Sequence, residues 1–195
     1  MIQAPSIRER SGCSRRPSDL SPITTDRLAA LLADYVRQTG ATVDLLLVGG
    51  LALQAYGAAD RVTHDVAGEL VGDLDALAHF LRSHEVPADL GENISGWSVI
   101  AMPPGYRERA TVLLAQPGLR IRLLHPTDFV VAKLRRGTDL DLDDAEYVAR
   151  RFEVHPQAIR AAGEAAVAAS PRDTALFLFR KTLDVFCARI AAPPG

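Results

Sequence analysis

The chain has 195 residues, of which 48% are hydrophobic and 24% charged, and its formal net charge is −2. This length fits one domain with a helical appendage, and the absence of an uninterrupted apolar stretch of ~18 residues argues against a membrane span. The small net charge provides no overall attraction to nucleic acid, and the two cysteines, Cys13 and Cys187, favour a reduced, cytoplasmic compartment over a disulfide scaffold or a zinc site.

Residues 1–20 differ in composition from the rest of the chain. They contain four arginines among serines and prolines, with almost no apolar periodicity and no hydrophobic segment of the kind found in secretory signals. We predict a disordered tail here, and a basic arm that binds nucleic acid or a partner is the alternative. No other strong nucleic-acid patch is expected.

The next stretch alternates helical and strand patterns. A helix is predicted to open at Ser21-Pro22 and to end at Gly40. The apolar run of residues 43–48 predicts a buried strand, and residues 51–56 predict a short helix that stops at Gly57. A second strand is expected over residues 65–71.

The remainder is first β-rich and then helical. Asp73 is the expected N-cap of a third helix. Strands are predicted over residues 97–101, 111–115 and 119–124, the last two joined as a hairpin by Gln116-Pro117-Gly118. Helices are predicted over residues 125–137, 141–152 and 156–169, and from Ser170-Pro171 onward.

The junction between the first strand and its helix carries the clearest chemical signal. Gly49-Gly50 would let backbone N–H groups approach an anion at a helix N-terminus. Asp65 opens the next strand, where it can hold a divalent metal against that anion. A tight turn without any ligand is the structural alternative for the glycines. A surface ion pair with Asp60 or Asp65 is the alternative for Arg61.

These segments resemble a known superfamily. Val48-Gly49-Gly50-Leu51-Ala52, followed by Arg61-x-Thr63-x-Asp65, resembles the nucleotidyltransferase superfamily in its small bacterial "GG-x-A … T-x-D-x-D" branch, which includes toxin–antitoxin nucleotidyltransferases. The resemblance implies that the glycines hold the triphosphate and that Asp65 binds magnesium. The family's second aspartate is replaced by Ala67.

The replacement weakens the expected metal site. Carboxylates at i and i+2 of a strand share a face and lie roughly 6.6 Å apart, whereas Glu69 lies roughly 13 Å from Asp65 in an ideal strand. A bulge at Gly68 would bring Glu69 closer, so Asp65 and Glu69 are the candidate metal ligands. The family's third carboxylate comes from a later strand, and residues 119–124 contain no acid. Magnesium binding is therefore expected to be weak or absent.

A second stretch extends the resemblance. Residues 125–134 show a Pro-x-Asp start and a Lys-Leu pair, and Asp141 and Asp144 open the following helix. The resemblance implies that Lys133 faces the cleft, where it contacts nucleotide phosphate or pairs with one of these acids. The structural alternatives are a lysine whose stem lies on the surface and acids that cap a helix. Residues 103–109 also resemble a Pro-Pro-Gly-aromatic loop, which we interpret as a structural turn.

The resemblance covers roughly residues 43–150 and completes the prediction. The expected fold is α/β (α+β), with a nucleotidyltransferase-like small mixed sheet flanked by helices over residues 21–152 and a helical extension over residues 153–195. The implied activity is transfer of a nucleoside monophosphate from an NTP to a protein or RNA hydroxyl. A catalytically inactive relative that binds a nucleotide or a partner is the alternative. The implied catalytic residues are Asp65 and Lys133, and the implied nucleotide-binding residues are Gly49, Gly50, Arg61, Thr63 and Lys133.

Overall fold

The computed structural model describes residues 21–192, and the predicted tail over residues 1–20 lies outside them. A mixed sheet has the strand order β3-β2-β1-β5-β4. Its strands are β1 (Val43–Val48), β2 (Val66–Val71), β3 (Ala88–Gly91), β4 (Thr111–Gln116) and β5 (Leu119–Leu123). β1 pairs with β2 antiparallel and with β5 parallel, β2 pairs with β3 parallel, and β4 pairs with β5 antiparallel.

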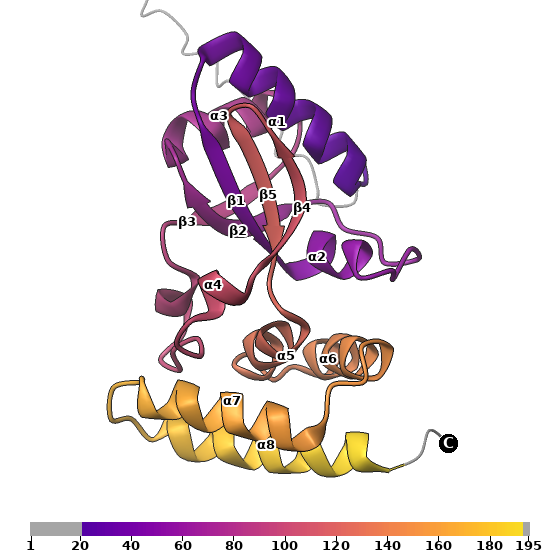
Figure 1. Cartoon of the computed structure of the whole chain (residues 1–195), viewed down its shortest axis with the longest axis vertical. Coiled ribbons are helices and arrows are strands. Elements are labelled where there is room, and N and C mark those ends of the chain that lie inside the picture. The colour runs from indigo at the N-terminus through magenta and orange to yellow at the C-terminus, as the bar shows by residue number, and fades with distance from the viewer. Residues whose placement is uncertain (1–20, 193–195) are drawn as a thin grey trace, which may run out of the picture.

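Helices lie against the sheet and beyond one end of it (Figure 1). The helices that pack beside the strands are α1 (Thr25–Thr39) and α3 (Leu74–Ser83). The helices stacked beyond the sheet are α5 (Pro126–Leu134), α6 (Asp139–Arg151), α7 (Pro156–Ala168) and α8 (Ala175–Ala191). Short helices connect these layers: α2 (Gly49–Ala55), the 3₁₀ helix η2 (Ile94–Trp97) and α4 (Tyr106–Arg109). The predicted fold class is confirmed.

Local sequence explains where most of these elements begin and end. The Thr24 side chain accepts a hydrogen bond from the Arg27 backbone N–H, so α1 starts after Thr24 and not at Ser21-Pro22. Gly40 ends α1 with a φ of 69°, the left-handed conformation that favours glycine. Asp73 caps α3 as predicted, through the backbone N–H of Ala76.

Two predicted elements differ from the structure, and one strand was not predicted. Residues 97–101 are not a strand, because Asn93 caps η2 and the chain after Trp97 stays irregular. The short strand β3 was not predicted, since four residues with one aspartate and one glycine carry no strand periodicity. The last helix begins at Ala175, four residues later than its predicted first turn at Pro171.

The hydrophobic core runs from the sheet into the stacked helices. Buried residues of β1 such as Leu45 belong to the same cluster as Phe129 of α5 and Phe186 of α8. The predicted boundary at residue 152 falls in the short connection between α6 and α7. No helix within residues 21–192 combines the length and the apolar character that crossing a membrane requires.

Candidate functional site

A cavity of about 300 Å³ lies between the end of the sheet and α5. It is lined by every residue that the sequence predicts for nucleotide binding or catalysis: Gly49, Gly50, Arg61, Thr63, Asp65 and Lys133. The other residues of the lining are Val62, three residues of the sheet (Val48, Ala67 and Asp89), three of η2 and the residue after it (Ile94, Trp97 and Ser98), and four of α5 and the residues after it (Phe129, Ala132, Arg135 and Arg136). The structure therefore brings together segments that are distant in sequence.

The two glycines at the start of α2 are needed for different reasons. Gly49 has a φ of 71°, a conformation that side-chain-bearing residues rarely adopt. A Cβ atom on Gly50 would lie 2.6 Å from the Cβ atom of Thr63, which is closer than real Cβ contacts. The turn therefore packs directly on the segment that leads to Asp65, and this contact accounts for Gly50 without any ligand.

That leading segment is fixed by hydrogen bonds. The Ile23 backbone N–H donates to the Thr63 carbonyl at 2.9 Å, and the Gln54 side chain donates to the Arg61 carbonyl at 2.8 Å. The Thr63 hydroxyl donates to the Asp65 carboxylate at 2.8 Å. Asp65 itself is exposed and lies immediately before β2. One of its carboxylate oxygens is thus oriented by Thr63 while the side chain faces the cavity.

Asp89 is the site residue that sequence reasoning missed. It lies on β3 directly beside Ala67, with which it is in register, and both line the cavity. Neighbouring strands lie about 4.8 Å apart, so Asp89 brings a carboxylate next to Ala67, the position at which the resemblance predicts an aspartate. The only available signal was indirect, because a strand–helix–strand unit places the second strand parallel to the first.

The structure does not bring Glu69 to the cavity. Its buried carboxylate accepts hydrogen bonds from the Tyr106 hydroxyl at 2.5 Å, the Ile94 backbone N–H at 3.0 Å and the Arg107 guanidinium. The predicted bulge at Gly68 is wrong, since β2 pairs with both neighbours in continuous register.

The electrostatic surroundings of Glu69 favour its charged form. Burial alone would raise its pKa, but the hydrogen bonds from Arg107, Tyr106 and the Ile94 N–H outweigh burial and hold the pKa below the ordinary value. Glu69 is therefore an ionised residue that joins α4 and η2 to the sheet.

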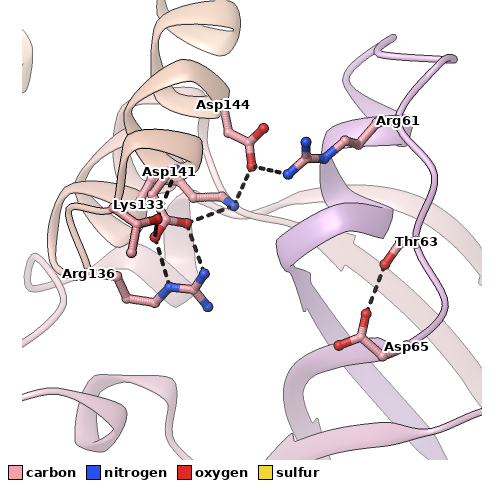
Figure 2. Close-up of polar contacts among 8 residues, drawn as sticks. Arg61, Thr63, Asp65, Lys133, Arg136, Asp141 and Asp144 are labelled. Carbon is pink, nitrogen blue, oxygen red and sulfur yellow. Dashed lines mark hydrogen bonds and ion pairs between the residues drawn. The ribbon is translucent and has the colours of Figure 1, made fainter. Parts of the chain in front are cut away.

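Lys133 lies at the centre of a group of charges on the α5–α6 side of the cavity (Figure 2). Its ammonium group donates to Asp144 at 2.7 Å and to Asp141 at 3.3 Å. Arg61, from the opposite side of the cavity, donates to the same Asp144 oxygen at 3.1 Å. Arg136 makes two hydrogen bonds to Asp141, at 3.0 and 3.1 Å. The predicted pairing of Lys133 with these acids is present.

The side of this group that faces the cavity is positively charged. Arg61, Lys133 and Arg136 line it, whereas Asp141 and Asp144 lie behind them and are buried. For Asp141, burial would raise the pKa, but hydrogen bonds from Thr138 and Arg136 and the charge of Lys133 lower it overall. Asp141 therefore stays ionised. The two acids orient cations that face the cavity, an arrangement suited to an anionic ligand.

The residues around the Pro-Pro-Gly sequence have a structural role. Gly105 has a φ of 80°, and α4 follows it. Arg109 makes two hydrogen bonds to the buried Asp128 of α5, at 2.8 and 2.9 Å. The turn thus connects the sheet to α5, which carries Lys133.

One comparison with known proteins found a match. The family model described as "Nucleotidyltransferase of unknown function (DUF6036)" matches residues 26–155. The matched segment includes every residue that lines the cavity and ends before α7. None of the curated proteins matches the chain.

Proposed function

The chain belongs to this family of nucleotidyltransferases of unknown function, and from that premise we propose that it transfers a nucleoside monophosphate from an NTP to a hydroxyl group of a protein or an RNA. The observation that carries the proposal is the convergence of the glycine turn, Asp65, Asp89 and Lys133 on one cavity. We also propose that the protein belongs to the toxin–antitoxin branch and acts with a protein partner.

The phosphate groups would lie between the glycine turn and the cations. In this proposal the backbone of Gly49 and Gly50 faces the phosphates, and Arg61, Lys133 and Arg136 neutralise their charge. Arg61 and Lys133 lie on opposite sides of the cavity, and both donate hydrogen bonds to Asp144. The two cations are therefore oriented before a nucleotide arrives. Such pre-orientation is the main contribution a protein makes to phosphoryl transfer.

Asp65 and Asp89 are the proposed magnesium ligands, in place of Asp65 and Glu69. Both present hard carboxylate oxygens to the cavity, as magnesium requires, and this ion is commonly bound by one or two carboxylates together with substrate phosphates. Within residues 21–192, no three His, Cys, Asp or Glu side chains are grouped so that they could hold a metal ion together. Magnesium would supply charge neutralisation at the reacting phosphate, and we expect it to bind well only together with the nucleotide.

The proposed reaction forms one bond and breaks one. The acceptor oxygen attacks the α-phosphorus, the bond from that phosphorus to the bridging oxygen breaks, and pyrophosphate leaves. The acceptor proton passes to a carboxylate or to water. Lys133 and Arg61 stabilise the negative charge that develops on the departing phosphates.

Calorimetric titration with ATP, GTP, CTP and UTP, with and without magnesium, tests nucleotide binding, and transfer of α-³²P label to added protein or RNA tests the reaction. Asp65→Asn should lower the magnesium-dependent part of the affinity at least about tenfold, because it removes a charged ligand. Asp60→Asn is the matched control, since Asp60 is an exposed neighbour outside the cavity. Failure of all four nucleotides to bind at millimolar concentration would overturn the proposal.

The alternative, a catalytically inactive nucleotide-binding protein, rests on Ala67. Strong NTP binding without label transfer to any acceptor would favour it. Label transfer that depends on Asp65 would exclude it.

A further inference from the structure

The cavity has an aromatic side that the proposed reaction does not use. Trp97 is the single tryptophan of the chain, and it lines the same cavity as the glycine turn. It is 44% exposed, so a large part of its apolar surface is not covered by protein. An indole at the edge of a cavity offers a flat surface on which another ring can stack.

The position of this indole is set by the structure around it. A Cβ atom on Gly91 would lie 2.7 Å from the indole Nε1 atom, so the ring packs on the bare backbone of β3. Arg135 donates hydrogen bonds to the carbonyl groups of Ile94 at 3.1 Å, Ser95 at 2.8 Å and Ile100 at 2.7 Å. Burial lowers the pKa of Arg135 to about 10, and the residue remains a cation at neutral pH. Contacts with β3 on one side and with Arg135 on the other therefore fix the segment that carries Trp97.

The strand register gives the order of groups across the cavity floor. Val48, Ala67 and Asp89 are neighbours on β1, β2 and β3, and Gly49 follows Val48. Gly91, on which Trp97 packs, lies two residues beyond Asp89 on the same strand. From the glycine turn to the indole, the order is therefore turn, carboxylates and aromatic ring, with roughly 10 Å between the first and third strands.

A nucleoside triphosphate has its groups in the same order: terminal phosphates, the metal-bound α-phosphate, and the base. We infer that Trp97 is the nucleobase-binding residue of this site and stacks on the base of an NTP whose phosphates face Gly49 and Gly50; this rests on the proposed function. Stacking needs only a π-face, so all four bases bind, and the larger purine rings overlap the indole more than pyrimidines do.

Binding measured with and without a base separates this role from the others. Sodium tripolyphosphate supplies the phosphates alone, and ATP supplies phosphates and base. Trp97→Ala should weaken ATP binding about tenfold or more and leave tripolyphosphate binding unchanged, while Trp97→Phe should retain most of the ATP affinity. Val99→Ala is the matched control, because Val99 is also 44% exposed, two residues further on, and does not line the cavity.

Fluorescence provides a second readout on the unmodified chain. With a single tryptophan, stacking of a base should quench the emission on addition of ATP, and tripolyphosphate should leave it unchanged. Equal ATP affinity in Trp97→Ala and the parent would overturn the inference, and so would an equal loss of ATP and tripolyphosphate binding. Absence of NTP binding to the parent chain would instead overturn the proposed function together with the inference.

Discussion

At the scale of single residues, Ala67 decides the character of the site. It occupies the i+2 position after Asp65, faces the cavity and lies beside Asp89. A carboxylate here would join two acids that the structure already places around it. The site thus has an alanine between two carboxylates, and the Gly49 turn packs against that alanine of β2.

Ala67→Asp should raise magnesium-dependent nucleotide affinity about tenfold, equivalent to ~1.4 kcal/mol, because an additional carboxylate strengthens binding of a hard, well-hydrated cation. Titration of ATP at fixed magnesium concentrations measures this. Ala67→Asn is the control of equal size without the charge. If Ala67→Asp and Asp65→Asn both leave the magnesium dependence unchanged, Asp65 is a structural residue that pairs with Thr63.

At the scale of elements, the site depends on contacts between short segments and the sheet. Glu69 of β2 joins Tyr106 and Arg107 of α4 to the first residue of η2. Arg109 of α4 then reaches Asp128 at the start of α5. Through these contacts, a strand residue on which no reaction step depends fixes the elements that line two sides of the cavity.

Glu69→Gln should lower the free energy of unfolding by about 2 kcal/mol at pH 7, because it removes the buried charge that pairs with the Arg107 guanidinium. The pKa of Glu69 is lower in the folded chain than the ordinary 4.5, so its stabilisation is complete above that value and is lost as the pH falls through the folded pKa. The stability difference between parent and variant should therefore shrink below about pH 4.5.

Urea denaturation between pH 3 and 8 checks this, with Glu108→Gln as a control at an exposed acid of α4, the helix that Glu69 contacts. A difference that does not change with pH would contradict the ionised role of Glu69. Nucleotide binding by Glu69→Gln should keep its magnesium dependence, because Glu69 does not line the cavity.

At the scale of the whole molecule, the sheet and the stacked helices share one core. The ion pair between Arg61 and Asp144 also connects the two sides of the cavity across 83 residues of sequence. A cavity formed between two layers keeps its shape only while both are folded. Helices α7 and α8, which lie outside the matched family segment, therefore support the site indirectly.

Phe186→Ala should lower the free energy of unfolding by roughly 3–5 kcal/mol, since it removes a side chain that is 1% exposed in α8. Circular dichroism follows the helices and Trp97 fluorescence follows the sheet side, so both urea transitions should shift together. Val185→Ala, at a 67% exposed neighbour, is the control. A Trp97 transition that does not move would show that residues 153–195 unfold as a separate unit.

The sequence by itself determined the fold class and the glycine turn, and its resemblance to nucleotidyltransferases indicated that Lys133 pairs with Asp141 or Asp144 or contacts phosphate. These features are local: an apolar run that ends in glycines predicts a strand and turn, and Lys133, Asp141 and Asp144 lie on consecutive helices joined by a short connection. Local spacing rules predict the turn, whereas the expected pairing of Lys133 with an acid came from the family resemblance.

Only the tertiary structure decided the rest of the site. Asp89 lies beside Ala67 because a four-residue edge strand pairs with β2, and Glu69 is held by side chains that follow it by 37 and 38 residues. Trp97 reaches the cavity because its segment folds as a 3₁₀ helix and Arg135 holds it. Each contact joins segments far apart in sequence, and neither periodicity nor local propensity encodes such packing.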